Sequence, residues 1–123
     1  MKGRNLPFII AIIFSVFFFF TENYLESDEL YYNDKPVQIS VHAACRMECR
    51  EVDEADINTV LKYGIENTRK SNYNDTRGCP TIALEGRTDN KQSLRVIVAD
   101  CEQFAKIVTV IDLSNDYPCG DCN

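Results

Sequence analysis

The chain of 123 residues lacks most of the motifs by which an enzyme is recognised from sequence. It has no glycine-rich phosphate loop, no Ser-His-Asp order and no paired-carboxylate motif, so the mechanisms that use them are not indicated. It has no tryptophan, and the few other aromatic residues of its folded part do not make a stacking platform. No internal repeat is present, and the length suits one domain with a modest core. Histidine chemistry, if there is any, depends on the single residue His42.

The start of the chain carries one apolar run and no signal for its removal. Lys2 and Arg4 precede the run Leu6–Phe20, in which only Ser15 is polar. The run is shorter than the roughly 20 residues of a typical spanning helix, but it suits a signal-peptide core or a short signal anchor. No small-x-small cleavage site and no lipid-accepting cysteine follow it. We therefore predict an N-terminal hydrophobic helix in residues 1–21 and favour a membrane anchor over a cleaved signal peptide, with a buried core helix as the alternative.

The charges around this run indicate on which side of the membrane the domain lies. Basic residues precede the run, and four acidic residues follow it: Glu22, Glu26, Asp28 and Glu29. This asymmetry predicts an exported domain, at the outer face of the inner membrane, in the periplasm or outside the cell. The formal net charge of −6 disfavours nucleic acid as a partner. The part from Gln38 to Asp112 is nearly balanced in charge, so a local basic patch remains compatible with RNA.

The polar segment 22–38 is expected to be a linker, and Pro36 closes it. An α+β domain is predicted for residues 39–113, with a cysteine-containing tail in 114–123. The first predicted helix covers about 41–49 behind the cap Ser40, with Val41, Cys45 and Cys49 on its apolar side. The second helix begins at the cap Asp53 and ends at Gly64. Its buried stripe consists of Ile57, Val60 and Leu61.

Beyond the second helix the apolar period changes to two, which predicts strands at about 65–70, 81–87, 94–101 and 106–113. A hairpin centred on Asn90 aligns the apolar residues of its two strands on one face and sets Glu85 opposite Arg95. The expected fold is therefore two helices packed on a mainly antiparallel sheet of three or four strands.

The chain has six cysteines, and in an exported protein an even number favours disulfides. The hairpin register sets Cys79 opposite Cys101, which predicts a bond between them. In the tail, Cys119 and Cys122 are too close in sequence to bond each other well, so we expect the tail to fold back on the first helix and pair with Cys45 or Cys49. The alternative is a zinc site built from Cys45, Cys49, Cys119 and Cys122. Apart from zinc, no cofactor is expected.

His42, Arg46 and Arg50 follow one another at helical spacing and form a basic stripe about 80° wide. An arginine beside the histidine favours the neutral imidazole, which accepts a proton. Arginines also bind phosphate in bidentate fashion and stabilise charge that develops on it. These three residues are therefore candidate catalytic residues. The alternative is an ordinary surface stripe whose arginines are neutralised by carboxylates, namely Glu48, Glu51, Glu85 and Asp100.

The ordered elements of the chain resemble the family named domain of unknown function 4258. They are His42, Arg46-Met47, Arg50, the helix start Val52–Ile57, Gly64, the strand 94–99 and Val108-Thr109-Val110. The resemblance covers roughly residues 40 to 112. It implies a fold like that of the RelE and barnase-like toxin nucleases, in an exported, cysteine-rich variant.

The resemblance also implies ribonuclease-like roles for the basic stripe, and more loosely for Arg95 and Thr109. Lys70 and Arg69 are weaker candidates to extend a phosphate path. Two classes of function remain open on this evidence. One is recognition of RNA or another phosphodiester, with cleavage that needs no metal if the protein is an enzyme. The other is a non-enzymatic, cysteine-stabilised module that binds a protein partner or has a structural role in the cell envelope.

Overall fold

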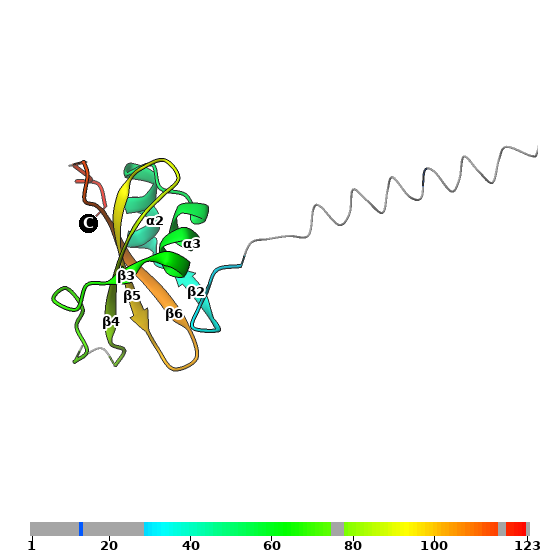
Figure 1. The fold of residues 1–123 in the computed structure, drawn as a ribbon, viewed down its shortest axis with the longest axis vertical. Coiled ribbons are helices and arrows are strands. Elements are labelled where there is room, and N and C mark those ends of the chain that lie inside the picture. The colour runs from blue at the N-terminus through cyan, green and yellow to red at the C-terminus, as the bar shows by residue number, and fades with distance from the viewer. Residues whose placement is uncertain (1–12, 14–28, 75–77, 116–117, 123) are drawn as a thin grey trace, which may run out of the picture.

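The computed structural model describes residues 13, 29–74, 78–115 and 118–122. Within them, two helices lie against a curled, mixed sheet of six strands (Figure 1). The elements are β1 (Tyr31–Tyr32), β2 (Lys35–Ile39), α2 (Val41–Cys49), α3 (Glu54–Tyr63), β3 (Ile65–Glu66), β4 (Thr81–Arg87), β5 (Ser93–Asp100) and β6 (Ala105–Asp112). The order across the sheet is β1-β2-β6-β5-β4-β3, and only β2 and β6 run parallel. The predicted α+β class with two helices and a mainly antiparallel sheet is confirmed.

The helix ends follow the predicted caps. The Ser40 hydroxyl accepts a hydrogen bond from the amide of Ala43 at 2.9 Å. Asp53 and Asp56 form a reciprocal capping box at the start of α3. At the other end, the amide of Gly64 donates to the carbonyl of Val60, and α3 stops there. The caps therefore explain why two short helices begin and end at these residues.

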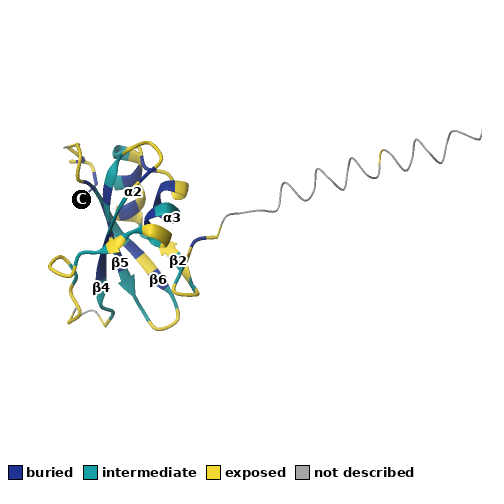
Figure 2. Cartoon of the chain, in the orientation of Figure 1, coloured by how far each residue is buried: buried dark blue, intermediate teal, exposed yellow. Residues whose placement is uncertain are grey.

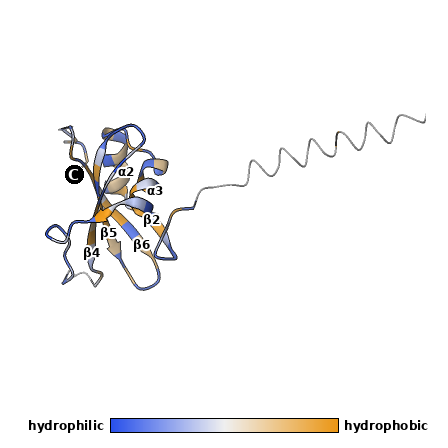
Figure 3. Cartoon of the chain, in the orientation of Figure 1, coloured by the Kyte–Doolittle hydropathy of each residue, from blue (hydrophilic) through white to orange (hydrophobic). Residues whose placement is uncertain are grey.

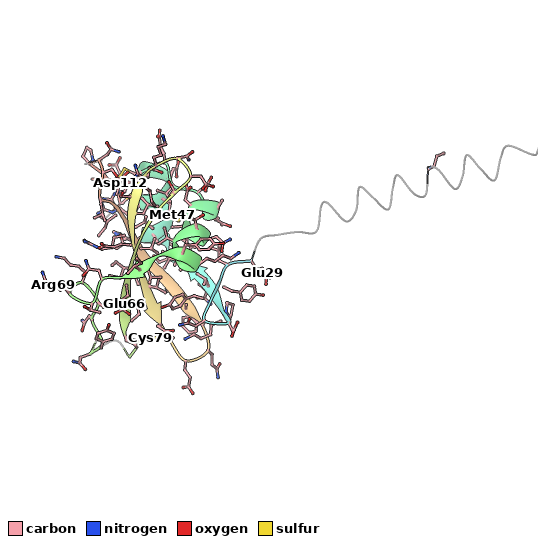
Figure 4. The ribbon with its side chains drawn as sticks, in the orientation of Figure 1. Glu29, Met47, Glu66, Arg69, Cys79 and Asp112 are labelled. Atoms are coloured by element: carbon pink, nitrogen blue, oxygen red, sulfur yellow. A yellow bond between two sulfur atoms is a disulfide. The ribbon has the colours of Figure 1, made fainter. Side chains whose placement is uncertain are left out.

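The buried face of α2 differs from the predicted one. Val41 was expected on the apolar side, but it is 89% exposed, whereas Ala43 and Met47 are buried against the sheet. Met47 appears in Figure 4 between α2 and the strands. Cys45 and Cys49 are only half-buried. The prediction was wrong because it counted these two cysteines as core, which rotated the helix away from the face that contacts β6.

The central hairpin has the predicted register. Leu84 pairs with Val96, and Glu85 pairs with Arg95. Between β5 and β6 the pairing shifts at Ile97 and Val98, so that Val108 of β6 is an extra residue in the ladder. Such a bulge bends a strand and increases its twist. The shift was not foreseen, because nothing in the sequence of β6 interrupts its apolar pattern.

The sheet is larger than the predicted three or four strands, because the segment expected to be a linker supplies two of them. Its turn residues Asn33 and Asp34 both have positive φ, of 50° and 62°. This is the pattern of a tight two-residue hairpin turn, and it joins β1 to β2. Pro36 pairs only with Tyr31 of the outermost strand, where a missing N–H is tolerated. In turn, β2 lies parallel to the start of β6.

The strand predicted for residues 65–70 is also shorter in the structure. Only Ile65 and Glu66 pair with β4. The chain then turns at Thr68–Lys70, and the amides of Lys70 and Ser71 donate to the carbonyl of Asn67. This turn ends the strand early, because Asn67, Arg69 and Lys70 have no apolar side chain to bury.

The hydrophobic core lies between the helices and one face of the sheet (Figure 2). Its fully buried large side chains are Ile57, Val60, Leu94, Val96, Val98, Ile107 and Val110. Hydrophobic residues lie on the strands and on both helices, and the loop that joins β4 to β5 is hydrophilic (Figure 3). The alternate residues of β4, β5 and β6 form the opposite side of the sheet, which we call the open face. Most of its residues are half-buried or exposed.

The predicted signal peptide or anchor in residues 1–21 lies outside the described residues, apart from Ile13. Among the residues that are described, no helix is long and apolar enough to cross a membrane.

Candidate functional site

A pocket of about 590 Å³ lies on the open face. Pockets of this size are typical of small-molecule sites. It crosses the sheet from β4 through β5 and β6 to the start of α2. The lining residues are Ser40, His42, Cys79, Thr81, Ala99, Cys101, Phe104, Lys106 and Val108. The single histidine of the chain therefore belongs to a pocket.

His42 stands at the first turn of α2, and its side chain is exposed. Two hydrogen bonds fix the chain just before it: the amide of Ser40 donates to the carbonyl of Ile107, and the Ser40 hydroxyl donates to that of Val108 at 3.2 Å. The start of the helix is thus attached to β6, beyond the point where β2 stops pairing with it. Residues 118–122 of the tail lie beside Cys45, Glu48 and Cys49 of α2, and none of these five tail residues lines the pocket of His42.

Lys106 is a site residue that the sequence analysis did not select. It follows the first residue of β6, is exposed, and lines the same pocket as His42. In the sheet it pairs with Ala99 on one side and with Gln38 on the other. The strand alternation already placed it on the polar face. Its approach to His42 depends on the pairing of β2 with β6, which the sequence did not reveal.

Arg50 has a structural position at the end of α2. Its guanidinium donates a hydrogen bond from Nη1 to the carbonyl of Val110, and its own carbonyl accepts one from Gln92 at 3.0 Å. It therefore joins α2 to the edge of β6. Arg46, one turn earlier, is half-buried, and its Nε is enclosed without a hydrogen-bond partner in the described part of the chain. Neither arginine lines the pocket.

Arg95 belongs to a second group on the open face. Its Nε lies 2.7 Å from Oε2 of Glu85, and the Arg95 side chain is 18% exposed. Asn67 donates to the same carboxylate oxygen at 2.9 Å. These two hydrogen bonds hold the pKa of Glu85 below its ordinary value, and the bond from Asn67 has the larger effect. The charge of Lys70 lowers this pKa further. The structure therefore gathers Arg95 and Lys70 around Glu85, apart from the pocket.

Thr109 lies between these two groups on the open face. It pairs with Ile97 across the sheet and is half-buried. Two of the four predicted carboxylate partners pair with other cations, since Glu85 pairs with Arg95 and Asp100 contacts Lys35. Of the predicted catalytic and substrate-binding residues, only His42 lines the pocket.

Three disulfides join all six cysteines. Cys79 is bonded to Cys101, as the hairpin register predicted, and this bond lines the pocket. Cys45–Cys122 and Cys49–Cys119 attach the tail to α2, as expected. In Figure 4, Cys79 and Asp112 mark opposite ends of the sheet, so the pocket disulfide and the tail lie far apart. The three bonds are compatible with an oxidising, exported location.

The alternative zinc site required Cys45, Cys49, Cys119 and Cys122 as thiolates. In the structure these sulfurs form the two tail disulfides, and no cysteine is free. No other group of three or more metal-binding side chains occurs among the described residues. The same four cysteines therefore act as a covalent attachment of the tail.

A comparison with protein families supports the predicted resemblance. The model of the family described as domain of unknown function DUF4258 matches residues 39–112. No curated protein and no solved structure matches the chain. The matched residues run from the end of β2 to the end of β6 and include both His42 and Lys106. Because they make up more than half of the sequence, the chain belongs to the DUF4258 family.

Proposed function

We propose that this protein is an exported domain that binds a phosphodiester of single-stranded RNA in the open-face pocket and cleaves it without a metal ion. One observation carries the proposal: a pocket of ligand size is lined by the only histidine and by an exposed lysine, His42 and Lys106. A base and a cation that face one cavity are the minimum that RNA cleavage needs. The RelE- and barnase-like nuclease fold that we expect for the DUF4258 family is in keeping with the same chemistry.

In the proposed reaction His42 is the general base. Its imidazole takes the proton of the ribose 2′-hydroxyl, and the 2′-oxygen then attacks the adjacent phosphorus. The bond from phosphorus to the 5′-oxygen breaks, and that oxygen takes a proton from water. The protonated His42 then gives its proton to the hydroxide that remains, which restores the base. The products are a 2′,3′-cyclic phosphate and a free 5′-hydroxyl. Lys106 stabilises the negative charge that builds up on the phosphoryl oxygens.

The arginines have separate roles in this proposal. Arg50 positions α2, because its guanidinium bonds to the carbonyl of Val110. Arg46 lies between Arg50 and His42 on the helix and adds positive charge behind the pocket. Arg95, Thr109 and Lys70 extend the path of the RNA backbone along the open face. Because Glu85 offsets the charge of Arg95, we expect a smaller contribution there than from Lys106.

Export is the second part of the proposal. The apolar run Leu6–Phe20 provides the signal or anchor, with the membrane as partner if it is uncleaved, and three disulfides suit an oxidising compartment. Thiol counting on protein taken from envelope and cytoplasmic fractions tests it. Protein with six blocked sulfurs in the envelope fraction is expected. Recovery in the cytoplasm with free thiols would overturn this part.

The activity is tested with the oxidised full-length chain in mild detergent and a single-stranded RNA oligonucleotide, in the presence of a chelator. We expect slow cleavage that leaves 2′,3′-cyclic ends. His42→Ala is expected to abolish cleavage and to change RNA affinity little. Lys106→Gln is expected to weaken both binding and cleavage. Lys62→Gln, on the exposed surface of α3, is the matched control and should behave like the wild type.

Each outcome separates the two classes of function. Binding that depends on Lys106 but is never followed by cleavage would remove the catalytic part and leave a binding domain. Absence of both binding and cleavage over several RNA sequences would overturn the proposal. It would then favour the non-enzymatic, disulfide-stabilised envelope module.

A further inference from the structure

The two ends of the open-face pocket differ in chemistry. At the end beside α2, Ser40 and His42 present polar groups, and Lys106 follows them on β6. At the other end the pocket is lined by Phe104 and by the Cys79–Cys101 disulfide. The paired residues Thr81, Ala99 and Lys106 lie between these ends. A ligand that fills this pocket therefore has one anionic part and one flat or apolar part.

The distance between Lys106 and Phe104 suits a single nucleotide. Phe104 directly precedes β6, and Lys106 is the second residue of that strand. Residues two apart on a strand lie on the same face, roughly 7 Å from each other. When a phosphate contacts Lys106, the base of the same nucleotide reaches Phe104.

The apolar end is held rigidly before any ligand arrives. The amide of Cys101 donates to the carbonyl of Phe104 at 3.0 Å, which closes the turn between β5 and β6. The carbonyl of Cys101 accepts a hydrogen bond from Nζ of Lys35 at 2.7 Å, and its sulfur is bonded to Cys79. The turn that carries Phe104 is thus fixed to both β2 and β4. A fixed ring loses little conformational freedom when a ligand packs on it.

We propose that this end of the pocket is a nucleobase subsite, in which one unpaired base stacks on Phe104. The inference rests on the proposed phosphodiester site and adds its substrate class, a single-stranded ribonucleotide with an accessible base. A single aromatic ring serves one base, whereas successive bases would need several rings. A base inside a duplex cannot enter, so the subsite selects single strands.

The test uses the oxidised full-length chain and two small probes, adenosine 3′-monophosphate and ribose 5-phosphate, with Kd measured by calorimetry. The wild type is expected to bind the nucleotide more tightly than the sugar phosphate. Phe104→Ala is expected to weaken nucleotide binding roughly five- to hundredfold and to leave ribose 5-phosphate unchanged. Tyr63→Ala removes an aromatic ring that is 79% exposed on α3, outside the pocket, and should change neither.

Phe104→Leu keeps an apolar side chain in the pocket and removes the aromatic face, so it is expected to weaken nucleotide binding by an intermediate factor. Thermal unfolding of both Phe104 variants checks that the turn remains folded. Unchanged nucleotide binding in Phe104→Ala, or equal loss for both probes, overturns the base subsite. If Lys106→Gln still weakens both probes in that case, the proposed phosphate site survives. If neither probe binds the wild type, the phosphate site and the base subsite fail together.

Discussion

The two faces of the central sheet carry different kinds of residue on the same strands. On the helix-covered face, Leu94, Val96 and Val98 of β5 are fully buried. On the open face the same strand presents Arg95, Ile97 and Ala99, all only partly covered. The first set removes apolar surface from water and supplies stability. The second set leaves the polar groups and the pocket accessible. Stability and ligand binding are therefore expected to respond to different substitutions.

The largest expected effect concerns the tail, whose two disulfides attach it to α2 with sequence separations of 77 and 70 residues. The bonds close nearly the same loop. While one remains, the other constrains only the few residues between them, so removing Cys49–Cys119 alone should cost about 2 kcal/mol in the free energy of unfolding. Removing Cys45–Cys122 as well opens the long loop and should cost about 4 kcal/mol more.

Urea denaturation of the paired cysteine-to-serine variants measures these losses. The combined loss is expected to exceed the sum of the two separate losses. A combined loss equal to that sum would show that the two bonds act independently. It would contradict the expectation that either bond alone keeps the long loop closed. Because neither bond lines the pocket, RNA affinity should persist in each single-pair variant that remains folded.

A matched pair on β5 tests the two faces directly. Leu94→Ala empties a fully buried position and is expected to lower the free energy of unfolding by about 3 kcal/mol. Ile97→Ala removes a half-buried side chain on the open face and is expected to cost about 1 kcal/mol. Both are measured by denaturant unfolding. Equal losses would mean that the open face is packed as tightly as the core, and the distinction between the faces would be wrong.

The smallest expected effect is the pH dependence due to Glu85. Hydrogen bonds from Asn67 and Arg95 lower its pKa in the folded state. A lowered carboxylate pKa contributes stability above the ordinary glutamate value, and this contribution is lost as pH falls through the folded pKa. Because the ion pair is partly exposed, we expect Glu85→Gln to cost under about 1 kcal/mol at pH 7.

Denaturant unfolding at a series of pH values checks this prediction. Glu85→Gln should narrow the difference in stability between neutral and acidic pH, whereas Glu102→Gln, at an exposed turn, should leave the wild-type profile unchanged. A profile for Glu85→Gln that runs parallel to the wild type would show that the carboxylate does not contribute through its charge.

Local features of the sequence were enough to predict much of this fold. Ser40, Asp53 and Gly64 cap the helices where they were expected, because capping depends on a few neighbouring residues. The alternation of apolar residues determined the β4–β5 register, and this register correctly brought Cys79 to Cys101. Both features arise within short stretches of chain.

The missed features depend on contacts between distant parts of the chain. The parallel pairing of β2 with β6 joins Val37 to Ala105, and no local pattern indicates that contact. That pairing brings the start of α2, and with it His42, to the pocket that Lys106 lines. The role of Arg50 likewise depends on a backbone carbonyl 60 residues away, at Val110. Sequence alone therefore found the histidine of the site and missed the lysine beside it.

The most direct test of the central claim is an NMR titration. A single-stranded RNA oligonucleotide is added to the oxidised protein, and the chemical shift of each backbone amide is recorded at every step. The account predicts saturable shifts at His42, Thr81, Ala99 and Lys106, with little change at Ile57 and Val60 of α3. Shifts that instead concentrate on the helices, or an absence of any shift at saturating RNA, would contradict the claim that the open face is the binding face.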